Sequence, residues 1–107
     1  MEAATFSALA EPNRLRIVEL LRLGPSTVGE LADKLQMKQP QASKHLRVLL
    51  EAGLVEVEVD ANRRHYRLRS KPFQELDDWL DAYRNLWNER FDNLDLYLKK
   101  LQAESHH

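Results

Sequence analysis

Residues 27–53 have the sequence TVGELADKLQMKQPQASKHLRVLLEAG, which predicts two short helices joined by a tight turn. Thr27 followed three residues later by Glu30 forms a capping box, a pattern typical of a helix start. Apolar residues at helical spacing follow as far as about residue 36, and after a turn a second helix is expected over residues 39–52. Gly53 ends it, because glycine readily takes the left-handed conformation that closes a helix.

Two more helices are predicted ahead of this stretch. The first covers residues 3–10 and ends at Glu11-Pro12, because the residue before a proline disfavours the helical region. Pro12 suits the first turn of the next helix, where a missing N–H costs nothing, and Gly24-Pro25 ends that helix. Its apolar residues form a stripe that we expect to face a core: Leu15, Val18 and Leu21, with Ile17 and Leu20 beside them.

After residue 53 the apolar period changes from 3.6 to 2, which predicts β-strands. Valines alternate with glutamates up to residue 59, and Tyr66 and Leu68 alternate with arginines after the turn residues Asp60-Ala61-Asn62. Alternation on both sides of an Asp/Asn turn is typical of a β-hairpin.

The residues after the hairpin predict one long helix of about thirty residues, because apolar residues recur at helical spacing for about eight turns. Two short helices with a tight turn, followed by a two-stranded ribbon, form the layout of a winged helix-turn-helix. We therefore predict a mainly α fold with a small β-hairpin and a single domain over residues 1–103. Its parts are the helix-turn-helix at 27–52, the wing at 54–69 and a C-terminal dimerisation helix at 72–102, followed by a tail at 104–107.

The composition limits the classes of protein that the chain can represent. It has 107 residues, 43% of them hydrophobic and 31% charged, with a formal net charge of -1, which fits one soluble domain. The absence of cysteine excludes disulfide scaffolds, thiolate zinc sites and thiol catalysis. No apolar run approaches the roughly 18 residues of a membrane span, and no secretory signal follows Met1, so we expect a cytoplasmic protein without a membrane partner. The terminal His106-His107 is interpreted as the remnant of an expression tag.

Charge is unevenly distributed along the chain. Residues 38–50 carry three basic side chains and no acid, and residues 61–71 carry five basic side chains and no acid. Residues 51–60 between them carry only acids. One positive stretch alone is more often a solvated face, but these two coincide with the second helix of the pair and with the hairpin tip. Together they are typical of a local contact with a polyanion.

These two elements supply candidate contacts with double-stranded DNA. Gln pairs with adenine, Lys with guanine or phosphate, and Ser with several base edges, while arginines at a hairpin tip reach phosphates or a minor groove. We expect the helix at 39–52 to bury Ala42, Leu46 and Leu49, with Leu50 on the same apolar face. Its outward side chains are expected to be Gln41, Lys44, His45 and Val48. The predicted DNA-contacting residues are Lys38, Gln39, Gln41, Ser43, Lys44, His45, Arg47, Arg63 and Arg64, with Asn13 and Arg14 as candidates for a phosphate at the start of their helix.

Several of these residues have a structural alternative. His45 could be a helix-surface residue without a role, and Ser43 could bond the carbonyl of the preceding turn. Arg67 and Arg69, which lie within a strand, are expected to include an ion pair with Glu56 or Glu58.

Four phrases of the sequence carry a resemblance to a known family. They are FSALAEPNRLRI (6–17), GELA (29–32), QPQASKHL (39–46) and EAGLV (51–55). In this order and at these distances they closely resemble the ArsR/SmtB family of bacterial winged-helix transcriptional repressors, over about residues 4–98. The resemblance implies a homodimeric operator-binding repressor that an effector releases from DNA.

The sequence departs from the metal sensors of that family. Their Cys-x-Cys phrase in the third helix has no counterpart, and the last helix offers Asp77, Asp78 and Asp81 without a histidine. We interpret these aspartates as a solvated helix face. Lys38 replaces the Ser or Thr cap of the family, and Ala61-Asn62 replaces its wing-tip glycine, which preserves the turn because Asn tolerates the left-handed conformation. We expect no cofactor and no metal, and the effector stays open between a small molecule, a partner protein and none.

The last helix has more apolar surface than one domain can cover. Thirty helical residues span about 45 Å, whereas a 100-residue domain has a radius of gyration of about 13 Å. Such a stripe left in water would exceed the apolar patches of soluble monomers, and packing on the second helix accounts only for its start. We predict a homodimer interface formed by Phe6, Leu9, Trp79, Tyr83, Trp87, Phe91, Leu94 and Leu98. The dimer is expected to bind an imperfect palindromic operator through residues 39–52 and the wing residues 60–65.

The sequence is also considered for two other functions, an enzyme and a protein-interaction module. An enzyme is not expected, because the sequence has no Gly-rich phosphate loop, no HExxH phrase and no Cys nucleophile, and Ser43 and His45 do not face each other on a helix. A winged helix used only for protein interaction or dimerisation is the alternative, and its sign is DNA binding that is absent or insensitive to salt.

Overall fold

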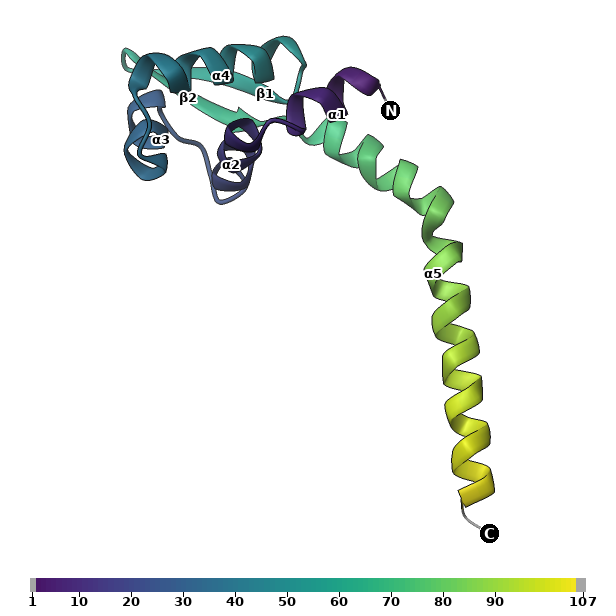
Figure 1. Cartoon of the computed structure of the whole chain (residues 1–107). Coiled ribbons are helices and arrows are strands. Elements are labelled where there is room, and N and C mark those ends of the chain that lie inside the picture. The colour runs from purple at the N-terminus through teal and green to yellow at the C-terminus, as the bar shows by residue number, and fades with distance from the viewer. Residues whose placement is uncertain (1, 106–107) are drawn as a thin grey trace. The chain divides into compact units, whose positions relative to one another are not determined.

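The computed structural model describes the backbone of residues 2–105 and the side chains of residues 2–88 and 96–103. Within these residues the chain forms helices α1 (Ala3–Leu9), α2 (Pro12–Leu21), α3 (Val28–Leu35) and α4 (Gln39–Glu51), strands β1 (Val55–Asp60) and β2 (Arg63–Leu68), and helix α5 (Ser70–Ser105) (Figure 1). This is the predicted order of elements, so the winged helix-turn-helix fold is confirmed. His106-His107 and the side chains of Phe91 and Leu94 lie outside the described residues.

Side-chain caps fix where α2 and α3 begin. Thr27 Oγ1 accepts a hydrogen bond from the Glu30 backbone N–H at 3.2 Å and donates one to Glu30 Oε1 at 3.1 Å, which confirms Thr27 as the cap of α3 and its pairing with Glu30. At α2, Pro12 occupies the first turn and Glu11 Oε2 accepts from the Arg14 backbone N–H at 2.8 Å. The predicted break at Glu11-Pro12 therefore separates α1 from α2.

The hairpin is tighter than the sequence predicted. β1 and β2 pair antiparallel up to Asp60 opposite Arg63, which leaves only Ala61 and Asn62 in the loop. Both loop residues have positive φ, 46° and 70°, as a two-residue type I′ turn requires. The second strand begins at Arg63, directly after the loop and within the predicted wing at 54–69.

A backbone bridge ties the hairpin to the segment before α3. The Ser26 N–H donates to the Tyr66 carbonyl at 3.0 Å, and the Tyr66 N–H donates to the Ser26 carbonyl at 2.8 Å. Thr27, the cap of α3, follows directly. The wing and the start of α3 are therefore held together by main-chain hydrogen bonds rather than by side chains alone.

The core lies between α2, α3, α4 and the start of β1. The predicted stripe of α2 is wrong at one position, because Leu15 is 42% exposed and Ile17 is fully buried instead. Val18 and Leu21 are buried as predicted, so the buried stripe is rotated toward Ile17 while it keeps helical spacing. The largest fully buried side chains are Ile17, Leu31, Leu46, Leu49, Leu54 and Val55.

Contacts divide the chain into two units, one up to Gln74 and one from Glu75. The first unit holds the helix-turn-helix and the hairpin. The second is the remainder of α5, which at 36 residues is longer than the predicted helix. Among the described residues, no helix is both long enough and apolar enough to cross a membrane.

Candidate nucleic-acid interface

Helix α4 is anchored by one buried face. Ala42, Leu46 and Leu49 are fully buried, where α4 packs against α2, α3 and β1 (Figure 1). The opposite side of its first two turns is exposed and carries predicted DNA contacts: Gln39, Gln41, Ser43 and Lys44, preceded by Lys38. The buried anchors therefore fix which side chains the helix offers to a ligand.

His45 does not lie on that outer side. Its side chain is only 15% exposed, and Nδ1 lies 3.7 Å from Glu11 Oε2, the oxygen that caps α2. Val48 is half-buried, and Leu50, at the edge of the apolar face, is 42% exposed. The prediction that His45 and Val48 point outward is therefore wrong, because α4 packs against α2 here. A DNA contact by His45 stays a prediction.

Arg47 lies farther along α4 and is exposed. Its Nε lies 3.2 Å from Glu51 Oε1, one helical turn away. An exposed pair of this kind is worth about 0.3–0.5 kcal/mol, so a phosphate can replace Glu51 at little cost. The predicted role of Arg47 as a DNA contact is compatible with this geometry.

Two arginines of the wing already have protein partners. Arg67 Nε lies 2.8 Å from Glu56 Oε1, and Arg67 Nη1 lies 3.2 Å from Glu58 Oε2, which confirms the ion pair expected in this strand. Arg69 Nη1 donates to the Gly53 carbonyl at 3.1 Å. Both guanidinium groups therefore hold the hairpin and its junction with α4.

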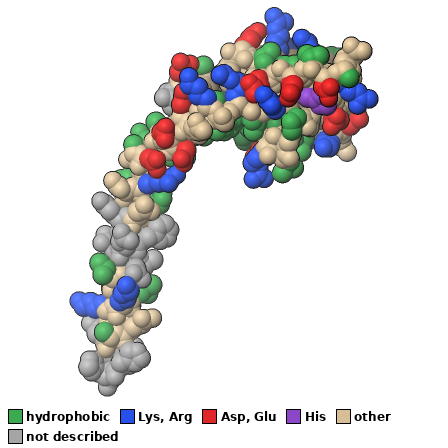
Figure 2. Space-filling model, turned by 180° about the vertical axis from the view of Figure 1, so that it is seen from behind, with side chains coloured by type: hydrophobic (Ala, Val, Ile, Leu, Met, Phe, Trp, Pro, Cys, Tyr) green, Lys and Arg blue, Asp and Glu red, His purple; other side chains and the backbone are tan. Residues whose placement is uncertain are grey.

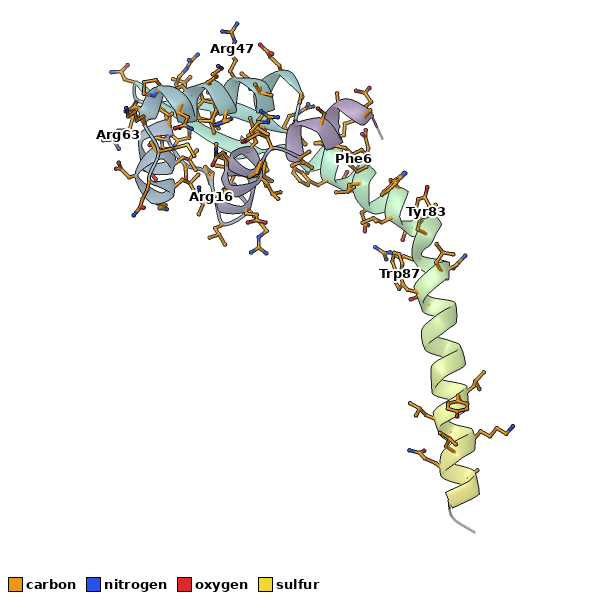
Figure 3. The ribbon with its side chains drawn as sticks, in the orientation of Figure 1. Phe6, Arg16, Arg47, Arg63, Tyr83 and Trp87 are labelled. Carbon is orange, nitrogen blue, oxygen red and sulfur yellow. The ribbon has the colours of Figure 1, made fainter. Side chains whose placement is uncertain are left out.

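The other two arginines of the wing have no ion-pair partner among the described residues. Arg63, labelled in Figure 3, and its neighbour Arg64 are both exposed, and neither forms an ion pair with any residue that the structure describes. Lys38 and Lys44 at the start of α4 are likewise without a carboxylate partner among those residues. Over the face of this unit that Figure 2 shows, acidic and basic side chains are interspersed. Unpaired positive charge therefore stands on both elements that carry the predicted DNA contacts.

A shallow hollow of about 360 Å³ lies beside these cations. Its walls come from the start of α3, the first residue of α4 and the hairpin tip: Thr27, Val28, Gly29, Gln39, Arg63 and Arg64. A methyl group added at Gly29 would meet no atom within 4 Å. The sequence analysis did not identify Gly29 as a site residue, because only the fold brings it close to the wing.

The predicted phosphate contacts at the start of α2 also have protein partners. Arg14 Nε donates to the Ala8 carbonyl at 2.8 Å and Nη2 to the Ser7 carbonyl at 3.4 Å, so this guanidinium binds the end of α1. Asn13 Oδ1 accepts a hydrogen bond from Arg16 Nη1 at 3.4 Å. A phosphate would have to displace these bonds, and its binding by Asn13 and Arg14 stays a prediction.

The three aspartates of α5 lie close together. Asp77, Asp78 and Asp81 are exposed and can each place one oxygen within 4.8 Å of the others. Arg84 pairs with Asp77 and, at 3.0 Å, with Asp81. This cation already offsets part of their negative charge, as expected for a solvated helix face.

The predicted dimer-interface residues are exposed wherever the structure describes them on α5. Tyr83 and Trp87 are labelled in Figure 3, and the rings of Trp79 and Tyr83 lie 4.9 Å apart. On α1, Phe6 is exposed and Leu9 is half-buried. The α5 residues are each 40–48% exposed: Trp79, Tyr83, Trp87 and Leu98.

Comparisons with known proteins match the same part of the chain. A family model described as a helix-turn-helix domain matches residues 9–58. The HTH-type transcriptional regulator Rv2034 of Mycobacterium tuberculosis is 41% identical over 78 residues, which cover 73% of each chain. The match to the biofilm growth-associated repressor of Agrobacterium fabrum, 42% identical, covers 62% of this chain and 56% of that repressor.

Solved structures agree with these matches. The crystal structure of the ArsR family transcriptional regulator RHA00566 is 32% identical, with a TM-score of 0.67, and the match covers 79% of this chain and 88% of that one. A homodimeric winged helix-turn-helix DNA-binding domain from Mycobacterium bovis, described as a possible ArsR-family regulator, is 30% identical with a TM-score of 0.62. That match covers 78% of this chain and 81% of the domain.

Proposed function

Because this chain belongs to the ArsR family of winged helix-turn-helix transcriptional regulators, we propose that it is a homodimeric repressor that binds an imperfect palindromic operator. The observation that carries the proposal is the position of its unpaired cations. Lys38 and Lys44 stand at the start of α4, and Arg63 and Arg64 stand at the hairpin tip. Cations without protein partners are free to neutralise DNA phosphates, which is the main source of affinity for DNA.

In each protomer, α4 is the helix that enters the major groove. Its first turns present two glutamines, Gln39 and Gln41, together with Ser43 and Lys44. Gln is suited to a bidentate contact with adenine and Lys to guanine or phosphate. The wing arginines then bind the adjacent backbone or minor groove, which positions the domain without specifying sequence.

A second copy of the chain completes the DNA-binding unit. The exposed aromatic and leucine side chains of α5 supply the apolar surface for this contact, since soluble monomers rarely leave such stripes in water. A two-fold dimer places its two reading helices on one face of the DNA, so the half-sites lie about one helical turn, roughly 34–36 Å, apart. The solved homodimer from Mycobacterium bovis supports this assembly by analogy.

The proposal includes no catalytic activity. The relatives reported above are named as regulators and repressors. The site of action follows as the bacterial cytoplasm, where the operator DNA lies.

Selection of bound DNA from a random duplex pool tests the proposal. Full-length protein is used, and the selected sites are sequenced after several rounds at about physiological salt. We expect an imperfect palindrome whose half-sites are one helical turn apart. A pool that stays random, or binding that does not weaken with salt, would show instead that the winged helix serves protein interaction.

A further inference from the structure

We propose that the hollow between α3, α4 and the hairpin tip binds one backbone phosphate of each operator half-site. The proposal rests on the DNA-binding function proposed above and adds the position of a specific contact. In this proposal the start of α3, and Gly29 in particular, takes part in DNA binding, a role that neither the sequence pattern nor the similar proteins indicate.

The charge of the lining residues favours a phosphate. Two of the six, Arg63 and Arg64, are cationic, and none is acidic. Neither arginine is engaged by a carboxylate among the described residues. The nearby carboxylate of Glu30 is held by the Thr27 hydroxyl at 3.1 Å and does not line the hollow. A phosphate placed there therefore gains two charge-assisted partners without displacing an existing ion pair.

The position of the hollow favours the DNA backbone over a free anion. Gln39 is both a wall of the hollow and the first residue of α4. In helix-turn-helix docking, the start of the recognition helix contacts base edges while the preceding helix crosses the backbone. Here that preceding helix is α3, so a strand that passes α4 in the groove runs over the start of α3.

Two of the elements that form the hollow, the wing and the start of α3, are tied together by the backbone. The wing is joined to the segment before α3 by the two backbone hydrogen bonds between Ser26 and Tyr66, at 3.0 and 2.8 Å. Thr27 caps α3 immediately afterwards. These bonds restrict movement of the wing relative to the start of α3, which favours a preorganised phosphate site between them.

Gly29 allows a test in which folding and binding change in opposite directions. It lies in the first turn of α3, and an added methyl group meets no atom of the protein. Gly29→Ala therefore leaves the thermal midpoint unchanged or raises it by a few degrees, because alanine favours helix over glycine. The same methyl occupies space in the hollow, so it is expected to weaken operator binding.

The experiment is a scan of the selected operator with single methylphosphonate substitutions, each of which removes the charge of one phosphate. Full-length wild-type protein is compared with Arg63→Ala/Arg64→Ala and with Gly29→Ala, and Lys34→Ala serves as a charge control at the far end of α3. We expect one phosphate per half-site whose neutralisation weakens wild-type binding roughly tenfold, the lower end for a hydrogen bond to a charged group. In the double arginine variant and in Gly29→Ala, neutralising that phosphate has little further effect, whereas Lys34→Ala keeps the full wild-type effect.

Equal effects of every methylphosphonate in the wild type and in both hollow variants would overturn the proposal. So would a Gly29→Ala variant that folds and binds the unmodified operator as tightly as the wild type. Should Gly29→Ala fail to fold, Gln39→Ala replaces it as the second hollow variant. The same comparison is then made: whether neutralising that phosphate weakens binding less in the variant than in the wild type. Failure of the proposed DNA-binding function can be distinguished from failure of the phosphate site. In the first case, the wild type would show no preference for the operator before any phosphate is modified.

Discussion

Replacing Arg64 with alanine is expected to reduce the salt dependence of operator binding, whereas replacing Arg67 is not. Both substitutions remove one positive charge from the same strand. Arg64, at the hairpin tip, has no ion-pair partner in the part of the chain that the structure describes, whereas Arg67 already bridges Glu56 and Glu58 at 2.8 and 3.2 Å. Only the first is free to displace counterions from a phosphate, so the comparison separates a DNA contact from a change in net charge.

The size of the effect follows from the two-fold dimer. Each lost phosphate contact reduces the magnitude of the slope of log K against log salt by about 0.9. Arg64→Ala removes one contact from each protomer, so the slope of the dimer is expected to fall in magnitude by about 1.8. Between 50 and 200 mM salt, the ratio of wild-type to variant affinity therefore shrinks about 12-fold. Arg67→Ala costs at most about 1 kcal/mol of stability, because its pairs are solvent-exposed.

Fluorescence anisotropy with labelled operator over that salt range measures both slopes. Thermal unfolding of each variant checks that the hairpin stays folded at the assay temperature. A slope for Arg67→Ala that falls as far as the slope for Arg64→Ala would refute the distinction between paired and unpaired arginines.

Three further predictions concern stability and assembly. Ala61→Asn is expected to raise the free energy of unfolding by up to about 1 kcal/mol, because position 61 has φ of 46° and Asn tolerates the left-handed region better than Ala. Thermal or urea unfolding measures this change, and an unchanged midpoint would contradict the prediction. Trp79→Ala/Trp87→Ala should convert the dimer to monomer, since replacing one buried aromatic side chain with alanine costs about 3–5 kcal/mol of stabilisation. Sedimentation at micromolar concentration measures this, and a variant that stays dimeric places the interface elsewhere. His45→Ala should lower stability but leave the operator consensus unchanged, because His45 faces Glu11 at 3.7 Å, and a base preference altered at one position would restore its predicted DNA contact.

Local sequence signals predicted the helix boundaries well. Capping at Thr27 and the proline at position 12 act within one helical turn, so their effect can be recognised from neighbouring residues. The ion pair of Arg67 was also predictable, because strand alternation places it opposite the glutamates of β1.

The predictions that were wrong concern which way a side chain points, because that direction depends on residues far away in the sequence. Leu15 and Ile17 both fit an apolar stripe, and only the packing of α2 against α3 and α4 decides which one is buried. His45 turns toward Glu11, thirty-four positions earlier in the chain, and Arg14 binds carbonyls at the end of α1. Neither contact has a periodic signal in the sequence. The hollow at Gly29 likewise exists only because the hairpin folds back beside α3.

Sequence-specific binding as a dimer is tested by one titration. Full-length protein is titrated against the selected palindrome and against a scrambled duplex of the same composition at about 0.15 M salt, with the stoichiometry measured in the same samples. We expect one dimer per palindrome and a preference of at least about 10³-fold over the scrambled duplex. Equal affinity for the two duplexes, or one monomer bound with full affinity, would contradict the assignment of a dimeric operator-binding repressor.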